Sequence, residues 1–258
     1  MVLVVLIMSV IVFAFYSGVF SALLTGANMH PEAFRIVESG APGSGFNASA
    51  VQLTGPNPSF PSGLTICTGT ITSTSGNLLV PPGASCTING ATVQSVYVNY
   101  GGSLTMNSAS GQGIYDNRSA SINIINNSQL SGNIGLYGTQ SFSMTNSQQT
   151  SGNLVMNGVV YASFSSTHLG GNLSATSCGS VQVDSDTVNG NIAFLNDQVV
   201  RLTNTIIQGT LTFVTDPNCY MANDTVHVIN GTCTGGAPSG GLDVLNTGAS
   251  IISLADST

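Results

Sequence analysis

The chain of 258 residues contains no lysine and no tryptophan, and its only permanent positive charges are Arg35, Arg118 and Arg201. Binding to nucleic acid needs a footprint of Lys and Arg that neutralises phosphates. Recruitment to an anionic lipid surface needs a similar basic cluster. Because the net charge is −7, we expect no nucleic-acid partner and no electrostatic recruitment to lipid.

Motifs for metal or phosphate chemistry are also missing. There is no Cys-x-x-Cys pair, and His30, His168 and His227 are scattered, which disfavours a zinc site. The sequence shows neither a nucleophile–His–carboxylate arrangement nor a phosphate-binding loop. We therefore expect no cofactor, no metal and no catalytic residue.

A repeat with a period of 19 or 20 residues is the main positive feature of the sequence. A fixed period of this length indicates one supersecondary unit stacked on copies of itself. Its signature is a Gly-Asn or Gly-Thr pair followed by an aliphatic residue, at Gly132-Asn133-Ile134, Gly152-Asn153-Leu154, Gly171-Asn172-Leu173, Gly190-Asn191-Ile192 and Gly209-Thr210-Leu211.

Aligning the repeats gives columns of apolar residues. The first column is wholly aliphatic, and the next two, eight and ten residues further on, alternate with polar residues as in strands with one buried face. A fourth, shorter column indicates a third strand per unit. The columns are Leu78, Val96, Ile114, Ile134, Leu154, Leu173, Ile192 and Leu211; Cys86, Leu104, Ile122, Phe142, Ala162, Val181, Val200 and Cys219; Ile88, Met106, Ile124, Met144, Phe164, Val183, Leu202 and Met221; and Leu169, Val188, Ile207 and Val226.

Three strands in a unit of about 19 residues describe a triangular coil, and stacked coils form a parallel β-solenoid. A helical repeat does not fit, because no unit shows apolar i, i+3, i+4 spacing, and Gly and Asn fall where they would destabilise a helix. We predict a mainly β protein with about eight coils of 18–20 residues over residues 64–230. At about 4.8 Å per coil the rod is roughly 38 Å long.

Polar residues mark the corners of the predicted coils. Asn tolerates the left-handed conformation that a sharp corner needs, and stacked amides can hydrogen-bond along the rod. The Gly of each Gly-Asn pair is expected to supply positive φ at another corner. The corner positions are Asn89, Asn107, Asn126, Asn146, Ser166, Ser185, Asn204 and Asn223. With these ladders, residues 64–230 resemble the right-handed parallel β-helix domains of secreted proteins, a resemblance that implies the fold and little about function.

Met1 to Leu24 is an uncharged apolar run. As a helix it would be roughly 36 Å long at about 1.5 Å per residue, enough to span a bilayer. The first interpretation is a secretory signal peptide, but the charged n-region of such a peptide is missing. The second is a conventional membrane anchor, but the Lys or Arg residues that usually flank an anchor are missing too. The third interpretation is the mature N-terminus of a type IV pilin whose basic leader has been removed.

This run resembles the N-terminal helices of archaeal type IV pilins, which are wholly apolar and bundle in the filament core. It departs from the bacterial pattern, because Val5 stands where a Glu would be expected. We predict an apolar helix over 1–27 and a Gly/Pro/Ser-rich linker over 28–63. Residues 231–258 are expected to form either a cap over the last coil, which we favour, or strands offered to a neighbour.

The cysteine spacing predicts a disulfide between Cys67 and Cys86, which lie one coil apart. Stacked positions have Cα atoms about 4.8 Å apart, which suits a disulfide. Cys219 and Cys233 are candidates for a second bond that leaves Cys178 free, although Cys178 could also pair with either of them. Candidate N-glycosylation sites are Asn47, Asn117, Asn126, Asn172, Asn223 and Asn230.

Two small charged groups are the candidates for a catalytic or calcium site: Asp184 and Asp186 with Arg201 a coil away, and Asp116 with Arg118. Enzymes with a β-helix that cleave acidic polysaccharides carry larger clusters of Asp with Arg or Lys. Calcium-binding solenoids carry repeated Gly/Asp loops, which are missing here. We expect both groups to be solvated or salt-bridged surface residues.

The resemblance to archaeal pilins implies a structural subunit of an extracellular filament, a helical homopolymer that is held in the cytoplasmic membrane before assembly. Its solenoid would form the filament surface, where it could bind surface glycans. The alternatives are a membrane-anchored cell-surface adhesin or glycan-binding rod and, third, a polysaccharide-acting enzyme.

Overall fold

A computed structural model of the protein describes residues 35–39, 48–52, 63–233 and 243–244. In these ranges the chain forms β-strands and turns, with no helix. No helix in the described part is long and apolar enough to cross a membrane. The predicted apolar helix over 1–27 lies outside the described residues, as do Asn47 and most of the C-terminal tail.

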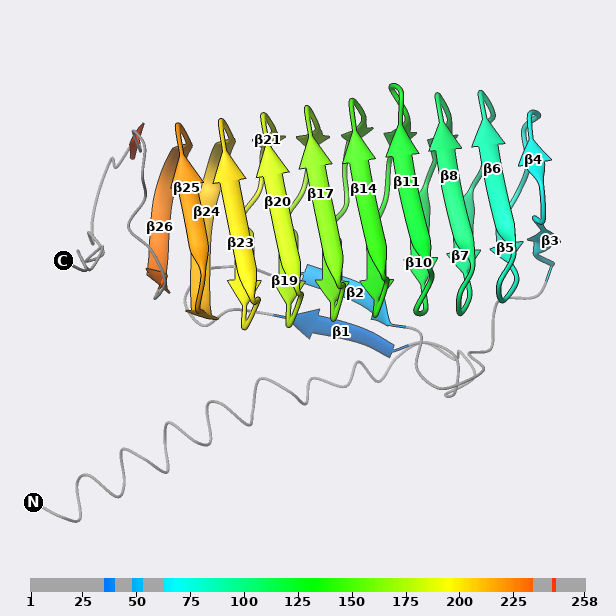
Figure 1. The fold of residues 1–258 in the computed structure, drawn as a ribbon. Coiled ribbons are helices and arrows are strands. Elements are labelled where there is room, and N and C mark those ends of the chain that lie inside the picture. The colour runs from blue at the N-terminus through cyan, green and yellow to red at the C-terminus, as the bar shows by residue number, and fades with distance from the viewer. Residues whose placement is uncertain (1–34, 40–47, 53–62, 234–242, 245–258) are drawn as a thin grey trace, which may run out of the picture.

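Residues from Thr65 to Cys233 form a parallel β-solenoid of about nine turns (Figure 1). From β7 onward each coil contributes three strands, as the columns predicted, whereas the third side of the coil before it has only an isolated bridge between Thr92 and Ser110. The second strands form a nine-stranded sheet along one face of the rod. The first and third strands form the other two faces, and these faces are joined into one sheet because β24 and β26 each continue around the corner between them.

The strand bounds follow the repeat. The first strands are β3 (Thr65–Ile66), β5 (Leu78–Val80), β7 (Ser95–Val98), β10 (Gly113–Asp116), β13 (Ile134–Tyr137), β16 (Leu154–Asn157), β19 (Leu173–Thr176) and β22 (Ile192–Leu195). The second strands are β4 (Thr70–Ile71), β6 (Ser85–Asn89), β8 (Ser103–Asn107), β11 (Ser121–Ile125), β14 (Ser141–Thr145), β17 (Tyr161–Ser165), β20 (Ser180–Asp184), β23 (Val199–Thr203) and β25 (Cys219–Ala222). The third strands are β9 (Ser110–Gly111), β12 (Gln129–Leu130), β15 (Gln148–Gln149), β18 (His168–Leu169) and β21 (Thr187–Val188), and the long strands are β24 (Ile206–Asp216) and β26 (Thr225–Cys233).

The strand register confirms all four predicted columns. Leu78 pairs with Val96, and the pairing continues through every predicted member to Leu211. The second and third columns are paired from β6 to β25 in the same way. Every residue of the first column is fully buried, so burial of stacked aliphatic side chains provides the main stabilising term.

The solenoid has about nine turns rather than the predicted eight. The additional coil is the first, in which β3 and β4 have only two residues each. Its Thr65 pairs with Leu78 of the first aliphatic column, but Thr65 is exposed. A search for aliphatic columns therefore could not find this coil.

The predicted Asn column combines two different positions. Asn89 pairs with Asn107, and Asn107 pairs with Ile125, one residue before Asn126. In the coils of Asn89 and Asn107 the left-handed corner residues are accordingly Gly90 and Ser108, whereas Asn126 and the later members are themselves left-handed. The side chains still form a ladder across the shift, since the amide of Asn126 donates to Asn107 at 2.8 Å and that of Asn107 donates to Asn89 at 2.9 Å.

The glycines of the Gly-Asn pairs have a different role from the predicted one. Only Gly152 among them has positive φ. A Cβ on Gly171 would overlap the carbonyl oxygen of Gly152 in the coil before it, and a Cβ on Gly190 would lie 2.5 Å from the carbonyl oxygen of Gly171. Glycine is therefore required at this edge mainly because neighbouring backbones approach each other too closely for any side chain.

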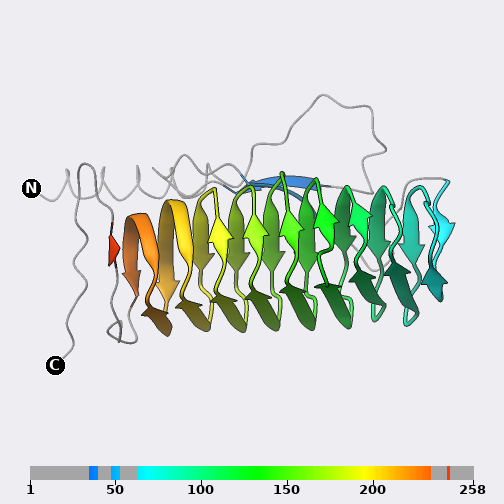
Figure 2. The same cartoon turned by 90° about the horizontal axis from the view of Figure 1, so that it is seen from above.

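Two strands lie in the range predicted as a linker. β1 (Arg35–Ser39) and β2 (Ala48–Gln52) form an antiparallel pair, and β2 lies against β10, β13 and β16. Figure 2 shows this pair lying lengthwise along one side of the rod. At the other end, β27 (Asp243–Val244) pairs with β26, so this part of the tail extends the last coil of its own chain.

Candidate functional site

The carboxylates proposed as one group, Asp184 and Asp186, lie on opposite sides of the solenoid wall. Asp184 is half-buried on the outer side and accepts a hydrogen bond from the Thr203 hydroxyl at 2.6 Å. Asp186 is 2% exposed and accepts the backbone N–H of Thr167. The prediction that both are surface residues is therefore wrong for Asp186, because a corner residue that turns inward can hydrogen-bond the backbone of the coil before it.

Asp116 is also buried rather than exposed. It pairs with Val98 in an apolar column of the core and is 1% exposed. One carboxylate oxygen accepts the backbone N–H of Ser119 at 3.0 Å, and the other accepts the hydroxyl of Thr139. Burial raises the pKa of Asp116 to about 6, although these hydrogen bonds oppose the shift. Its neighbour Arg118 is exposed and lies over the ring of Tyr137 instead.

Three further aspartates near the C-terminal end were not singled out by the sequence analysis. Both carboxylate oxygens of Asp197, Asp216 and Asp224 accept backbone N–H groups. One oxygen bonds the preceding coil, as from Cys178 N–H to Asp197 at 2.6 Å, and the other bonds a residue two positions earlier in the same coil. These side chains thus satisfy corner N–H groups that the strands leave unpaired, which is a structural task.

Burial raises the pKa of each of these carboxyls. It raises the pKa of Asp186 and of Asp197 to about 7, and that of Asp224 to about 6. The pKa of Asp216 is raised by the same cause. In Asp197 the nearby negative charge of Asp216 adds to the effect of burial. These carboxylates accept backbone N–H groups at the corners of the coils. Their arrangement therefore fits a role in stabilising the solenoid better than a role in proton transfer to a substrate.

Among the described residues, one disulfide has both of its cysteines identified. Cys67 and Cys86 form the predicted disulfide, with Cα atoms 5.4 Å apart. Cys219 is also disulfide-bonded, while the side chain of its predicted partner Cys233 lies outside the described residues. Cys178 is free and buried, and burial followed by the charge of Asp197 raises the pKa of its thiol to about 12. Such a thiol is a poor metal ligand and nucleophile.

No group of three or more His, Cys, Asp or Glu side chains in the described part of the chain is placed to hold a metal ion. His168 lies on the outer side of β18 beside Asn189, and His227 is an exposed residue of β26. His30 lies outside the described residues. The geometry therefore offers no support for a metal centre in the solenoid.

The candidate glycosylation sites differ in access. Asn126 and Asn223 are exposed at corners, and Asn172 and Asn230 are half-buried. Asn117 is only 5% exposed, so a transferase could not reach it in the folded solenoid. Asn172 also belongs to an axial ladder in which Asn133, Asn153, Asn172 and Asn191 each accept a backbone N–H from the next coil. Whether any of these positions carries a glycan stays a prediction.

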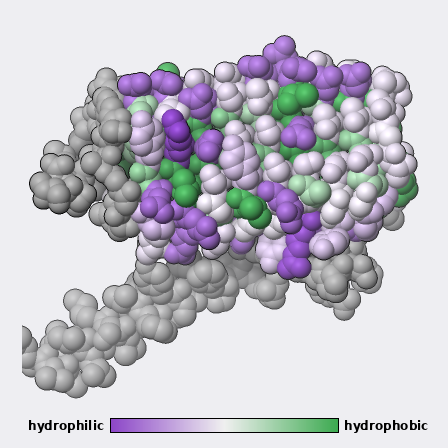
Figure 3. All heavy atoms as spheres, in the orientation of Figure 1, coloured by the Kyte–Doolittle hydropathy of each residue, from purple (hydrophilic) through white to green (hydrophobic). Residues whose placement is uncertain are grey.

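The exposed face formed by the second strands changes character along the rod. From β8 to β14 its outward residues are short and polar except for Ile125, as in Ser103, Thr105 and Ser143. From β17 to β25 larger side chains replace them, namely Tyr161, Gln182, Val199, Arg201 and Tyr220, which we call the tyrosine patch. Figure 3 shows apolar groups on this face as separate patches among polar ones.

The tyrosine patch was missed because the sequence analysis followed the inward columns. The outward residues that alternate with these columns do indicate the patch, because Tyr, Gln and Arg there interrupt a series of Ser, Thr and Asn. Comparison with known proteins gives no further information about this patch, because no protein-family model, curated protein or solved structure matches the chain. The fold and the surface chemistry of the chain are therefore the basis for assigning a function.

Proposed function

We propose that the chain is a structural subunit of an extracellular filament of the type IV pilus kind, with its apolar N-terminal segment in the filament core and its β-solenoid on the surface. The observation that carries the proposal is that one chain combines an apolar N-terminal segment with a solenoid whose surface is polar. Met1 to Leu24 is apolar and uncharged, whereas the solenoid hides its apolar residues inside and carries hydroxyl and amide groups outside.

The apolar segment supplies the free energy of assembly in this proposal. Burying apolar surface stabilises by about 25 cal/mol per Å², or about 1.5–3 kcal/mol for each large aliphatic or aromatic side chain. A run with more than a dozen such residues therefore outweighs contacts between solenoids whose walls have few charges. Before assembly the same segment would hold the subunit in the cytoplasmic membrane.

The solenoid supplies the durable outer wall. Its core is continuous over the full length of the rod. Phenylalanine rings of successive coils contact each other within it, as Phe194 stacks on Phe213 with 5.6 Å between ring centres. Its ladders of Asn and Asp side chains join successive coils by hydrogen bonds at all three edges. A wall built in this way suits a protein exposed outside the cell.

A charge placed in the apolar segment tests the proposal. We expect Ile11→Asp to abolish filaments of the full chain, as seen by negative-stain electron microscopy of material sheared from cells. The matched control, Ser143→Asp, adds the same charge to the outer face of β14 and should leave filaments intact. The proposal is contradicted if the wild-type protein is found only as monomers in detergent or as single rods anchored in the membrane.

A second function, a membrane-anchored adhesin or glycan-binding rod, is favoured by a different observation, the tyrosine patch. It shares the apolar segment with the first proposal but needs no self-assembly. Single rods on cells that still adhere to surfaces would favour it. A polysaccharide-acting enzyme is the weakest alternative, because the candidate carboxylates Asp184 and Asp186 do not face the same side of the wall.

A further inference from the structure

The tyrosine patch is a continuous surface on one flat sheet. Tyr161, Ser180 and Val199 pair in one row across β17, β20 and β23. Gln182, Arg201 and Tyr220 pair in the adjacent row across β20, β23 and β25. No register shift interrupts these strands, so the outward side chains form a regular grid.

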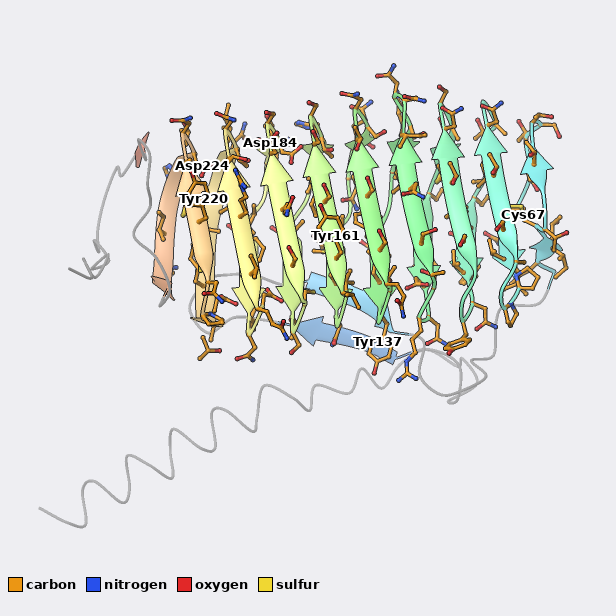
Figure 4. All side chains as sticks on the ribbon, viewed as in Figure 1. Cys67, Tyr137, Tyr161, Asp184, Tyr220 and Asp224 are labelled. Atoms are coloured by element: carbon orange, nitrogen blue, oxygen red, sulfur yellow. A yellow bond between two sulfur atoms is a disulfide. The ribbon has the colours of Figure 1, made fainter. Side chains whose placement is uncertain are left out.

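Two aromatic rings mark the ends of this grid. Tyr161 is 39% exposed and Tyr220 is 36% exposed, and Figure 4 shows both on the same outer face. They lie three coils apart, which is about 14 Å along the rod at about 4.8 Å per coil. Val199, 42% exposed, lies between them. The patch therefore spans several linked sugar rings or a similar extended ligand.

Polar groups hold the rings in place and lie beside them. The Tyr161 hydroxyl donates to the side-chain oxygen of Gln182 in the next coil at 3.2 Å. The guanidinium of Arg201 lies 5.0 Å from the centre of the Tyr220 ring, a cation–π distance. Side chains restrained in this way lose little conformational entropy when a ligand binds.

We propose that the tyrosine patch binds a neutral polysaccharide, which lies along the rod with the C–H faces of its sugar rings on Tyr161 and Tyr220. Aromatic side chains offer an apolar face next to a polar edge, which matches the alternation of C–H and hydroxyl groups on a sugar. Gln182, Arg201, Asp184 and Thr203 provide donors and acceptors beside the rings. The binding would act in adhesion.

Charge complementarity favours a neutral ligand over an acidic one. The chain has a net charge of −7, and Asp184 lies on the same face as Arg201, so the patch has no excess of positive charge. An acidic polysaccharide would meet repulsion from the rest of the chain. A protein partner would be expected to use a larger continuous apolar core than two separated rings supply.

The test measures binding of the full chain, whether filamentous or solubilised in detergent, to insoluble cellulose and chitin by co-sedimentation. We expect saturable binding that Tyr161→Ala and Tyr220→Ala each weaken about 2- to 12-fold, the equivalent of about 0.5–1.5 kcal/mol per aromatic contact. Tyr161→Phe keeps the ring and should retain most of the binding. Tyr100→Ala is the matched control, because Tyr100 is 64% exposed outside the patch.

The outcomes separate this proposal from the filament proposal. Binding that Tyr100→Ala weakens as much as Tyr161→Ala does, or no binding to either polymer, would overturn the patch whether or not filaments form. Preferential binding to polygalacturonate that is lost in Arg201→Gln would also overturn it, since it would show an acidic ligand. Unchanged thermal unfolding of the alanine variants shows that a loss of binding is not a loss of fold.

Discussion

Replacing the buried Asp116 by Asn should stabilise the solenoid at neutral pH. The carboxyl lies in an apolar column, and burial raises its pKa from 3.8 to about 6. A shift of about two units corresponds to about 3 kcal/mol at about 1.4 kcal/mol per unit. Asn keeps the shape of the side chain. Its amide oxygen can accept the N–H of Ser119, and its NH2 group can donate to the hydroxyl oxygen of Thr139. We therefore expect Asp116→Asn to be more stable than wild type by up to about 3 kcal/mol at pH 8.

The pH dependence gives the sign of the effect. Because the pKa of Asp116 is higher in the folded state than in the unfolded state, its protonated form contributes stability below pH 3.8 that is lost as the pH rises through about 6. Above that pH the folded wild type contains a buried negative charge, whereas Asn is neutral throughout. The advantage of Asp116→Asn should therefore shrink as the pH falls from 8 to 4 and vanish near pH 3.

Urea unfolding of the full chain in detergent, followed by circular dichroism at several pH values, measures this difference. Asp184→Asn removes a half-buried carboxylate from the outer face, and reports the effect of reducing the net charge while an amide oxygen can still accept the hydrogen bond from Thr203. If Asp116→Asn is no more stable than wild type at pH 8, or if its advantage does not depend on pH, then the hydrogen bonds from Ser119 and Thr139 outweigh burial and the reasoning is refuted.

Two further changes test the stacking of the coils. Reducing the Cys67–Cys86 disulfide, or replacing both residues by Ala, should lower the unfolding free energy by about 3 kcal/mol, because the bond closes a loop of similar length to the 15-residue reference case; an unchanged urea midpoint would contradict this. Gly171→Ala should prevent folding or lower the thermal midpoint strongly, because its Cβ would overlap the carbonyl oxygen of Gly152, whereas Gly158→Ala, with open space around its Cβ, should cost only about 1 kcal/mol of backbone strain. Equal midpoints for the two alanine variants would show that the coils can separate to admit a side chain.

The period and the inward columns could be predicted because strands impose a strict alternation on the sequence. Ile134 and Leu154 had to be aliphatic once a coil was closed on both sides by its neighbours, and a 19-residue return makes such positions easy to align. The Cys67–Cys86 bond followed from the same spacing. These features depend on local chemistry and on a fixed rise per coil, both of which a sequence displays.

Features that depend on the path of the backbone at corners could not be predicted in the same way. Asn107 and Asn126 look equivalent in sequence, but a one-residue shift places them at different corner positions. Gly171 looks like a residue chosen for positive φ, whereas it is required by close approach of the preceding coil. Asp116 and Asp186 are of a residue type that is usually exposed, and only the structure shows that they are buried and that corner N–H and hydroxyl groups offset part of the cost.

Cryo-electron microscopy of native filaments tests the central claim most directly. The account predicts filaments with a core of packed apolar helices, formed by residues 1–27, surrounded by separate solenoid rods of about nine turns. Filaments in which solenoids join end to end through β26 and β27, with the apolar segments outside the core, would contradict it, as would the absence of any filament made of this chain.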